Sequence, residues 1–94
     1  MDKKTEENTI FVGDKPLMNY ITGIVMQSTN ANEIVIKARG RHIAKAVDIT
    51  EIATKRFLTG KIKVDKVAID SEELTNKEGK QARVSSIEIT LKST

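Results

Sequence analysis

The residues best suited to chemistry are cations grouped around a glycine in the middle of the chain. The stretch from Glu33 to Asp48 reads Glu-Ile-Val-Ile-Lys-Ala-Arg-Gly-Arg-His-Ile-Ala-Lys-Ala-Val-Asp, so that Arg39, Arg41 and Lys45 flank Gly40. Alternating apolar residues before the glycine predict a strand, and the amphipathic pattern after it predicts a helix. A strand that feeds a helix through a glycine, with cations at the joint, is typical of an anion site.

A second joint of the same kind, Gly13-Asp14-Lys15-Pro16, lies earlier in the chain. In a βαβ unit both strand-to-helix loops lie at the same edge of the sheet, so we expect Lys15 near Arg39 and Arg41. The N-termini of the two helices add partial positive charge there. Arginine grips phosphate bidentately and lysine acts as a point charge, so this edge is a candidate phosphate-binding surface.

Three more side chains join this surface by position. Asn19 and Tyr20, one turn into the first helix, are placed to reach sugar or phosphate, and His42 stands at the start of the second helix. Because His42 is the only histidine and cysteine is absent, we expect no catalytic residues, no metal ligands and no cofactor. The pair Glu72-Glu73 fits a solvated acidic patch better than an acid–base pair.

The distribution of charge indicates a polyanionic partner. The 94 residues carry a net charge of +3. Residues 33–66 hold nine cations and four acids, a net charge of +5, whereas residues 1–32 and 67–94 each carry −1. A localised basic zone is the electrostatic footprint of nucleic-acid binding. The competing interpretation is a solvated basic face that only aids solubility.

Hydrophobic periodicity predicts the elements that position these residues. β-branched and aromatic runs predict four strands, two segments of helical period predict two helices, and Asn76–Lys80 predicts a hairpin turn. The expected strands cover residues 9–13, 33–39, 61–74 and 82–92, with a bulge or a bend at Asp65-Lys66. The expected helices run from Pro16 to Gln27 or Ser28, and from Arg41 or His42 to Leu58.

The order β-α-β-α-β-β predicts an α+β fold, a two-layer sandwich with a mixed four-stranded sheet and two helices on one face. The outer halves of the last two strands are polar, so we expect their hairpin to protrude as an arm. Residues 1–8 are expected to form a disordered tail and residues 9–94 a single domain. No segment suits a membrane span or a signal peptide, so we expect a soluble, intracellular protein with no membrane partner.

The second helix is expected to carry more apolar surface than one packing face needs. Its main apolar arc would comprise Ala46, Val47, Ile49, Thr50, Ala53 and Phe57. Ile52 lies outside this arc, which suggests a second contact such as a symmetric partner. Glu51 and Lys55 on the wet face are placed as an i,i+4 ion pair.

Four segments together resemble the Alba family of archaeal chromatin proteins. They are Gly13–Tyr20, Glu33–Asp48, Arg56-Phe57-Leu58 and Gln81–Thr90, in the family's order and spacing. The resemblance implies the β-α-β-α-β-β fold, which is similar to the C-terminal domain of bacterial translation initiation factor three. It implies a homodimer that binds double-stranded DNA and RNA, whose body lies across the duplex while its arms reach into the minor groove.

The resemblance also implies roles for particular residues. The nucleic-acid backbone would be contacted from the body by Lys15, Arg39 and Arg41, and from the arm by Lys77, Lys80 and Arg83. Dimer–dimer contacts along DNA would involve Arg56, Phe57 and Leu58. The full expected nucleic-acid site adds Asn19, Tyr20, His42 and Lys45.

One position departs from the family pattern. The family usually carries two lysines before the proline, the first of which is a site of regulatory acetylation, and here that position is Asp14. An acid there predicts weaker or more selective binding and argues against acetylation control. Lys15 remains a candidate for modification.

We therefore expect a non-enzymatic homodimer that coats or compacts double-stranded DNA with low sequence specificity and also binds RNA. It would act in the cytoplasm, associated with the chromosome. One alternative is a mainly RNA-binding role, as a ribonucleoprotein subunit or RNA chaperone. Another is a protein–protein interaction module whose basic loops are incidental.

Overall fold

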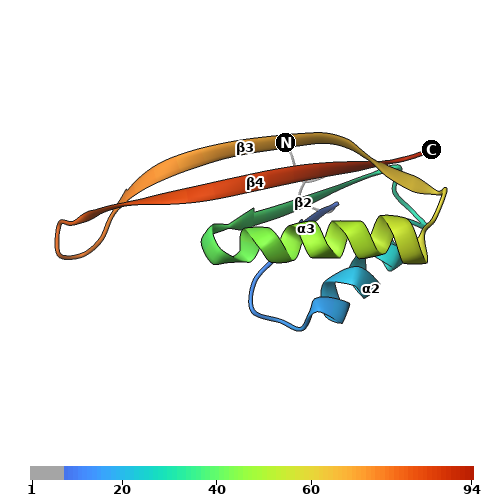
Figure 1. Cartoon of the computed structure of the whole chain (residues 1–94), viewed down its shortest axis with the longest axis horizontal. Helices are drawn as coiled ribbons and strands as arrows, with labels where there is room; N and C mark the ends of the chain where they lie inside the picture. The colour runs from blue at the N-terminus through green and yellow to red at the C-terminus, as the bar shows by residue number, and fades with distance from the viewer. Residues whose placement is uncertain (1–7) are drawn as a thin grey trace.

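The computed structural model, which describes residues 8–94, places two helices on one face of a four-stranded sheet (Figure 1). The strands are β1 (Thr9–Phe11), β2 (Glu33–Arg39), β3 (Ile62–Thr75) and β4 (Gln81–Ser93), and the helices are α2 (Leu17–Gln27) and α3 (Ile43–Ile52). The strand order is β1-β2-β4-β3, with β1 and β2 parallel and the other pairs antiparallel. The predicted α+β sandwich is confirmed, while the predicted tail lies almost wholly outside the described residues.

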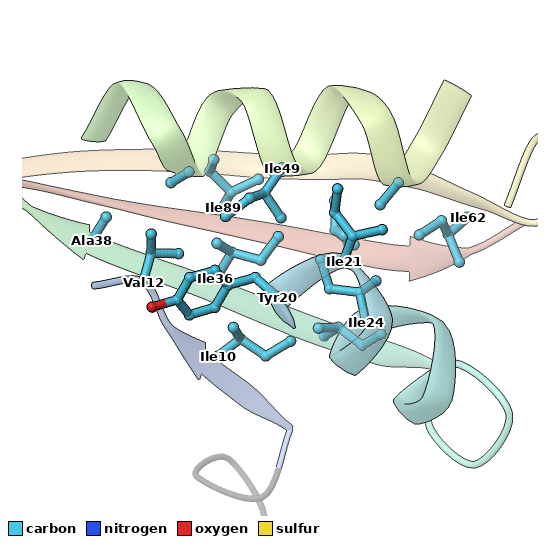
Figure 2. Close-up of a cluster of buried hydrophobic side chains, with 14 of the residues drawn as sticks. Ile10, Val12, Tyr20, Ile21, Ile24, Ile36, Ala38, Ile49, Ile62 and Ile89 are labelled. Atoms are coloured by element: carbon cyan, nitrogen blue, oxygen red, sulfur yellow. The ribbon is translucent and has the colours of Figure 1, made fainter. Parts of the chain in front are cut away.

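A core of isoleucines joins the two layers (Figure 2). On β2 the alternate residues Ile34, Ile36 and Ala38 are buried within this core, as the period of two predicts. Ile21 of α2 and Ile49 of α3 meet them with no exposed surface. Fully burying one such side chain stabilises a fold by about 1.5–3 kcal/mol, so this cluster fixes how the helices lie on the sheet.

The first helix begins one residue later than expected. Pro16 has φ −59° and ψ 149°, so it is the N-cap residue in extended backbone, and the helix starts at Leu17. A proline there removes no helical hydrogen bond, because the first N–H groups of a helix have no partner within the helix. The short first strand also ends at Phe11, which leaves residues 12–16 as a loop.

The glycine joint is confirmed as the break between the second strand and the second helix. Gly40 has φ +54°, a left-handed conformation that favours glycine, and it opens a 3₁₀ turn, Gly40–His42, before α3. The helix then ends in a π-helical turn, Ala53–Phe57, in which the Leu58 N–H donates to the Ala53 carbonyl at 2.9 Å. This turn contains one residue more than an α-helical turn, so it rotates the last side chains relative to the helix before them.

That rotation corrects the predicted apolar arc. Leu58 is only 8% exposed and joins the core, whereas Phe57 is 47% exposed. Val47 is exposed as well, because it lies at the edge of the buried arc. Ile52 is partly buried against the core, and its expected second contact with a symmetric partner stays a prediction. The predicted arc was therefore wrong for Phe57 and Val47, although the ion pair between Glu51 and Lys55 forms as expected, at 2.6 Å.

The last two strands form an arm that extends beyond the helices (Figure 1). The register shifts between Val64 and Lys66, so the predicted bulge is confirmed. The turn is closed by Asn76, whose side-chain oxygen accepts from the N–H groups of Glu78 and Lys80, both at 2.9 Å. The molecule is 47 Å long, and none of the helices within residues 8–94 is long and apolar enough to cross a membrane.

Candidate nucleic-acid interface

The loop between β1 and α2 is held through its N–H groups by Tyr20. The Tyr20 hydroxyl accepts from the N–H of Gly13 at 2.8 Å and from the N–H of Lys15 at 3.2 Å. Tyr20 is buried among the core isoleucines, as Figure 2 shows, so its ring is a fixed support. Its hydroxyl is committed to the loop backbone. Tyr20 thus fixes the backbone of the loop that carries Lys15, part of the candidate phosphate-binding surface.

Lys45 of α3 holds the same loop through its carbonyl groups. Its ammonium donates to the carbonyl of Gly13 at 2.9 Å and to the carbonyl of Lys15 at 2.5 Å. The Lys45 nitrogen also lies 5.4 Å from the centroid of the Tyr20 ring, within the range of a cation–π contact. Two side chains from two helices therefore occupy both the N–H and the carbonyl groups of Gly13 and Lys15.

These contacts bring the two strand-to-helix joints together, as the βαβ argument predicts. Arg41 Nη2 lies 3.0 Å from Asp14 Oδ1, and His42 Nε2 lies 3.6 Å from the same oxygen. Arg41 and Asp14 are each about three-quarters exposed, whereas the His42 side chain is 22% exposed. The acid that departs from the family pattern is therefore a direct neighbour of two predicted site residues.

Arg39 leaves the joint in a different direction. The strand alternation puts it on the face of the sheet away from the helices, and its Nη2 lies 3.0 and 3.2 Å from the two carboxylate oxygens of Glu72 on β3. Arg39 is thus tied to the base of the arm, while Arg41 faces the loop that carries Lys15. The three cations predicted to lie together therefore fall into two groups. Arg41 lies at the loop that carries Lys15, and Arg39 lies at the base of the arm.

A shallow hollow of about 380 Å³ lies beside the loop and is lined by Lys15, Asn19, Tyr20 and Thr22. Three of its lining residues, Lys15, Asn19 and Tyr20, belong to the site expected from the sequence. A larger hollow of about 760 Å³ has three acids and two cations among its charged lining residues, namely Asp70, Glu72, Glu88, Lys37 and Arg39. That balance favours the smaller hollow for phosphate.

The arm presents its own cations. Lys77 and Lys80 lie in the exposed hairpin turn, and within residues 8–94 they form no ion pair. Arg83 lies on β4, where its Nη2 is 3.3 Å from Glu73 Oε2. Among the described residues, the arm therefore offers two lysines without an ion pair at its tip and one paired arginine behind them.

The predicted dimer–dimer residues do not all face solvent. Arg56 and Phe57 are exposed at the end of the π-helical turn, whereas Leu58 is buried and closes the core. Any contact made by this segment is therefore expected from Arg56 and Phe57, with Leu58 in a supporting role.

Sequence reasoning placed Asp14 in the expected site but did not predict the ion pairs that three acids form there. Asp14, Glu72 and Glu73 each contact an arginine of the expected site, over separations of 27, 33 and 10 residues. The Glu73–Arg83 pair has a signal in the hairpin register, where the two residues lie opposite each other. The Asp14–Arg41 pair has one in the βαβ topology, which brings the two joints together. The Arg39–Glu72 pair has no such signal, because it depends on how the arm lies beside the end of β2.

Comparison with known proteins agrees with this geometry. The Alba family model matches residues 8–71. The protein named "DNA/RNA-binding protein Alba" from Methanocella arvoryzae is 50% identical over 88 residues, which covers 93% of this chain and 91% of that protein. Its namesake from Nanoarchaeum equitans is 51% identical over 84 residues, covering 87% and 93% of the two chains.

Solved structures give the same result. Alba from Thermoplasma volcanium superposes with a TM-score of 0.81 at 49% identity, over 90% of this chain and 99% of that one. ALBA1 from Trypanosoma brucei shares the fold, with a TM-score of 0.73 at 19% identity over 93% of this chain and 69% of that one. By its sequence, its fold and the placement of its two basic joints, this chain belongs to the Alba family.

Proposed function

We propose that this protein is a non-enzymatic homodimer that binds double-stranded DNA and RNA and coats or compacts the chromosome. Its relatives at about 50% identity carry the name "DNA/RNA-binding protein Alba". The contact that most supports the proposal is the bridge from Lys45 to the carbonyls of Gly13 and Lys15, because it fixes two cation-bearing joints on one surface.

The body contacts would come from that surface. Lys15 is exposed beside Asn19 in the small hollow, and the Arg41 guanidinium stands on the adjoining joint. The N-terminus of α2 opens at the same place, where unpaired N–H groups favour an anion. Contacts of this kind reach phosphate and sugar, so they hold a duplex with little preference for sequence.

The arm contacts would come from Lys77 and Lys80 at the tip of the hairpin. The arm reaches past the helices (Figure 1), so its tip can touch nucleic acid at a distance from the body. Side chains on a two-stranded ribbon can enter a groove that a flat surface cannot. Body and arm together would grip a longer stretch of backbone than either alone.

A homodimer is proposed from the apolar edge of the sheet. β3 is an edge strand, and its Val67 and Ile69 stand opposite Ile89 and Ile87 of β4, so they lie on the helix-covered face. They are nevertheless 54% and 80% exposed. Apolar side chains that continue a core surface into solvent fit a second copy of the chain, which would cover them by symmetry.

Binding is tested by salt titration with duplex DNA, duplex RNA and single-stranded RNA. Each phosphate neutralised on B-DNA should add about −0.9 to the slope of log K against log[salt]. Lys15→Gln should weaken binding and make the slope shallower, whereas Lys63→Gln, the same charge change at an exposed site on β3, serves as the control. No binding at low salt would reject the proposal, and a strong preference for RNA would favour a ribonucleoprotein role.

The dimer is tested by sedimentation. The wild-type protein should sediment as a dimer, and Ile69→Asp should shift it toward monomer, because a carboxylate in an apolar interface lacks a partner. Met26→Asp is the matched control, since Met26 is 66% exposed on α2, away from β3. A wild-type monomer would reject the dimer, and dissociation by both variants would reject the proposed surface.

A further inference from the structure

Each arginine of the proposed interface is held by a carboxylate of the same chain. The three pairs are Arg41 with Asp14 at 3.0 Å, Arg39 with Glu72 at 3.0 Å and Arg83 with Glu73 at 3.3 Å. The acids come from three different places, namely the loop before α2 and two positions on β3. The three ion pairs therefore do not arise from one local stretch of sequence.

The lysines of the same surface behave differently. Within residues 8–94, Lys15, Lys77 and Lys80 have no ion-pair partner. Arginine is the side chain best suited to bidentate binding of phosphate. The arginines, which would make the strongest contacts with nucleic acid, are therefore the residues that are paired with acids of the same chain.

The pairs are open to exchange. The side chains are exposed by between 43% for Glu72 and 77% for Arg41, so a phosphate can approach each guanidinium from solvent. Exposed ion pairs contribute little to stability and break readily. A guanidinium that turns to a phosphate leaves its carboxylate close to a second negative group, so the new contact is weaker than one made by a free arginine.

We propose that Asp14, Glu72 and Glu73 compete with nucleic-acid phosphate for the three interface arginines. The proposal rests on the nucleic-acid-binding function proposed above and explains how that site is regulated. In the free protein the acids occupy the guanidinium groups, and binding exchanges each carboxylate for a phosphate. Because a carboxylate that loses its arginine takes up a cation from solution, the exchange also makes the salt dependence shallower than the number of site cations predicts.

A double-mutant cycle on the body pair tests the exchange, with duplex DNA as the probe and fluorescence anisotropy at low salt as the readout. Asp14→Asn should tighten binding about two- to fivefold, in line with the strength of an exposed ion pair. In an Arg41→Gln background the same change should have clearly less effect, because the competed guanidinium is gone. Equal tightening in both backgrounds would show general repulsion and would overturn the proposal.

The arm pair provides an independent cycle. Glu73→Gln should tighten binding in the wild-type background and do less with Arg83→Gln. The control for net charge is Glu51→Gln, which breaks the 2.6 Å pair with Lys55 on the outer face of α3. If Glu51→Gln tightens binding as much as Asp14→Asn or Glu73→Gln, net charge alone is responsible and the competition is rejected.

The triple variant Asp14→Asn, Glu72→Gln, Glu73→Gln separates failure of this inference from failure of the proposed function. If the wild type binds duplex DNA and the cycles are additive, only the competition is overturned. If neither the wild type nor the triple variant binds, the proposed function fails with it. If the triple variant binds more tightly and with a steeper salt slope than the wild type, the acids limit binding as proposed.

Discussion

The Lys45 ammonium and the Tyr20 hydroxyl hydrogen-bond to the backbone of the same two residues, Gly13 and Lys15. Lys45 holds the carbonyls of Gly13 and Lys15, Tyr20 holds their N–H groups, and the Lys45 nitrogen lies 5.4 Å from the centroid of the Tyr20 ring. The arrangement positions Lys15 for a ligand. Lys45 and Tyr20 were both expected to contact nucleic acid, but in the structure their polar groups bind the backbone of the protein itself.

Replacing Tyr20 by phenylalanine should loosen the loop without opening the core. The change removes only the hydroxyl that accepts from Gly13 and Lys15, so the free energy of unfolding should fall by about 1–3 kcal/mol, the usual loss when partly buried N–H groups lose their acceptor. Urea denaturation measures the change. Unaltered stability would show that water replaces the hydroxyl at no cost.

Lys45→Met distinguishes a positioning residue from a phosphate contact. The variant keeps the apolar stem and removes the ammonium, so the carbonyls of Gly13 and Lys15 lose a donor. We expect lower stability and weaker binding, with the salt slope nearly unchanged. A direct phosphate contact would instead reduce the magnitude of the slope by about 0.9. Lys15→Met, in which an exposed lysine is lost, should show that second behaviour.

The elements could be predicted because their signals are local. The alternation of Ile34, Ile36 and Ala38 specifies the buried face of β2, and Gly40 marks the break because the left-handed backbone there suits glycine. The position of Arg41 next to the Gly13–Pro16 loop also followed, since βαβ topology alone brings the two joints together.

Other features depend on contacts that no local pattern encodes. Helical periodicity assumes a constant turn, so the extra residue of the π-helical turn reversed the expected burial of Phe57 and Leu58. The pair between Arg39 and Glu72 requires the arm to lie beside the end of β2. Such contacts appear only after the sheet is assembled.

The arm lysines should contribute to binding and not to folding. Lys77 and Lys80 are exposed in the turn and form no ion pair within residues 8–94, so Lys77→Gln with Lys80→Gln should leave stability within about 0.5 kcal/mol of wild type. The affinity for duplex DNA should fall, and each lost contact should reduce the magnitude of the salt slope by about 0.9. If affinity stays the same, the arm tip does not reach the duplex.

Substitutions of Phe57 and Leu58 should have different effects: the first on cooperative DNA binding, the second on the stability of the fold. Leu58 is 8% exposed within the core, so Leu58→Ala should lower the free energy of unfolding by about 2–5 kcal/mol. Phe57 is 47% exposed, so Phe57→Ala should cost about 1 kcal/mol or less. If Phe57 joins neighbouring dimers, Phe57→Ala should bind a short duplex normally and lose cooperativity on a long one. Cooperative coating that survives in Phe57→Ala would assign the dimer–dimer contact to another surface.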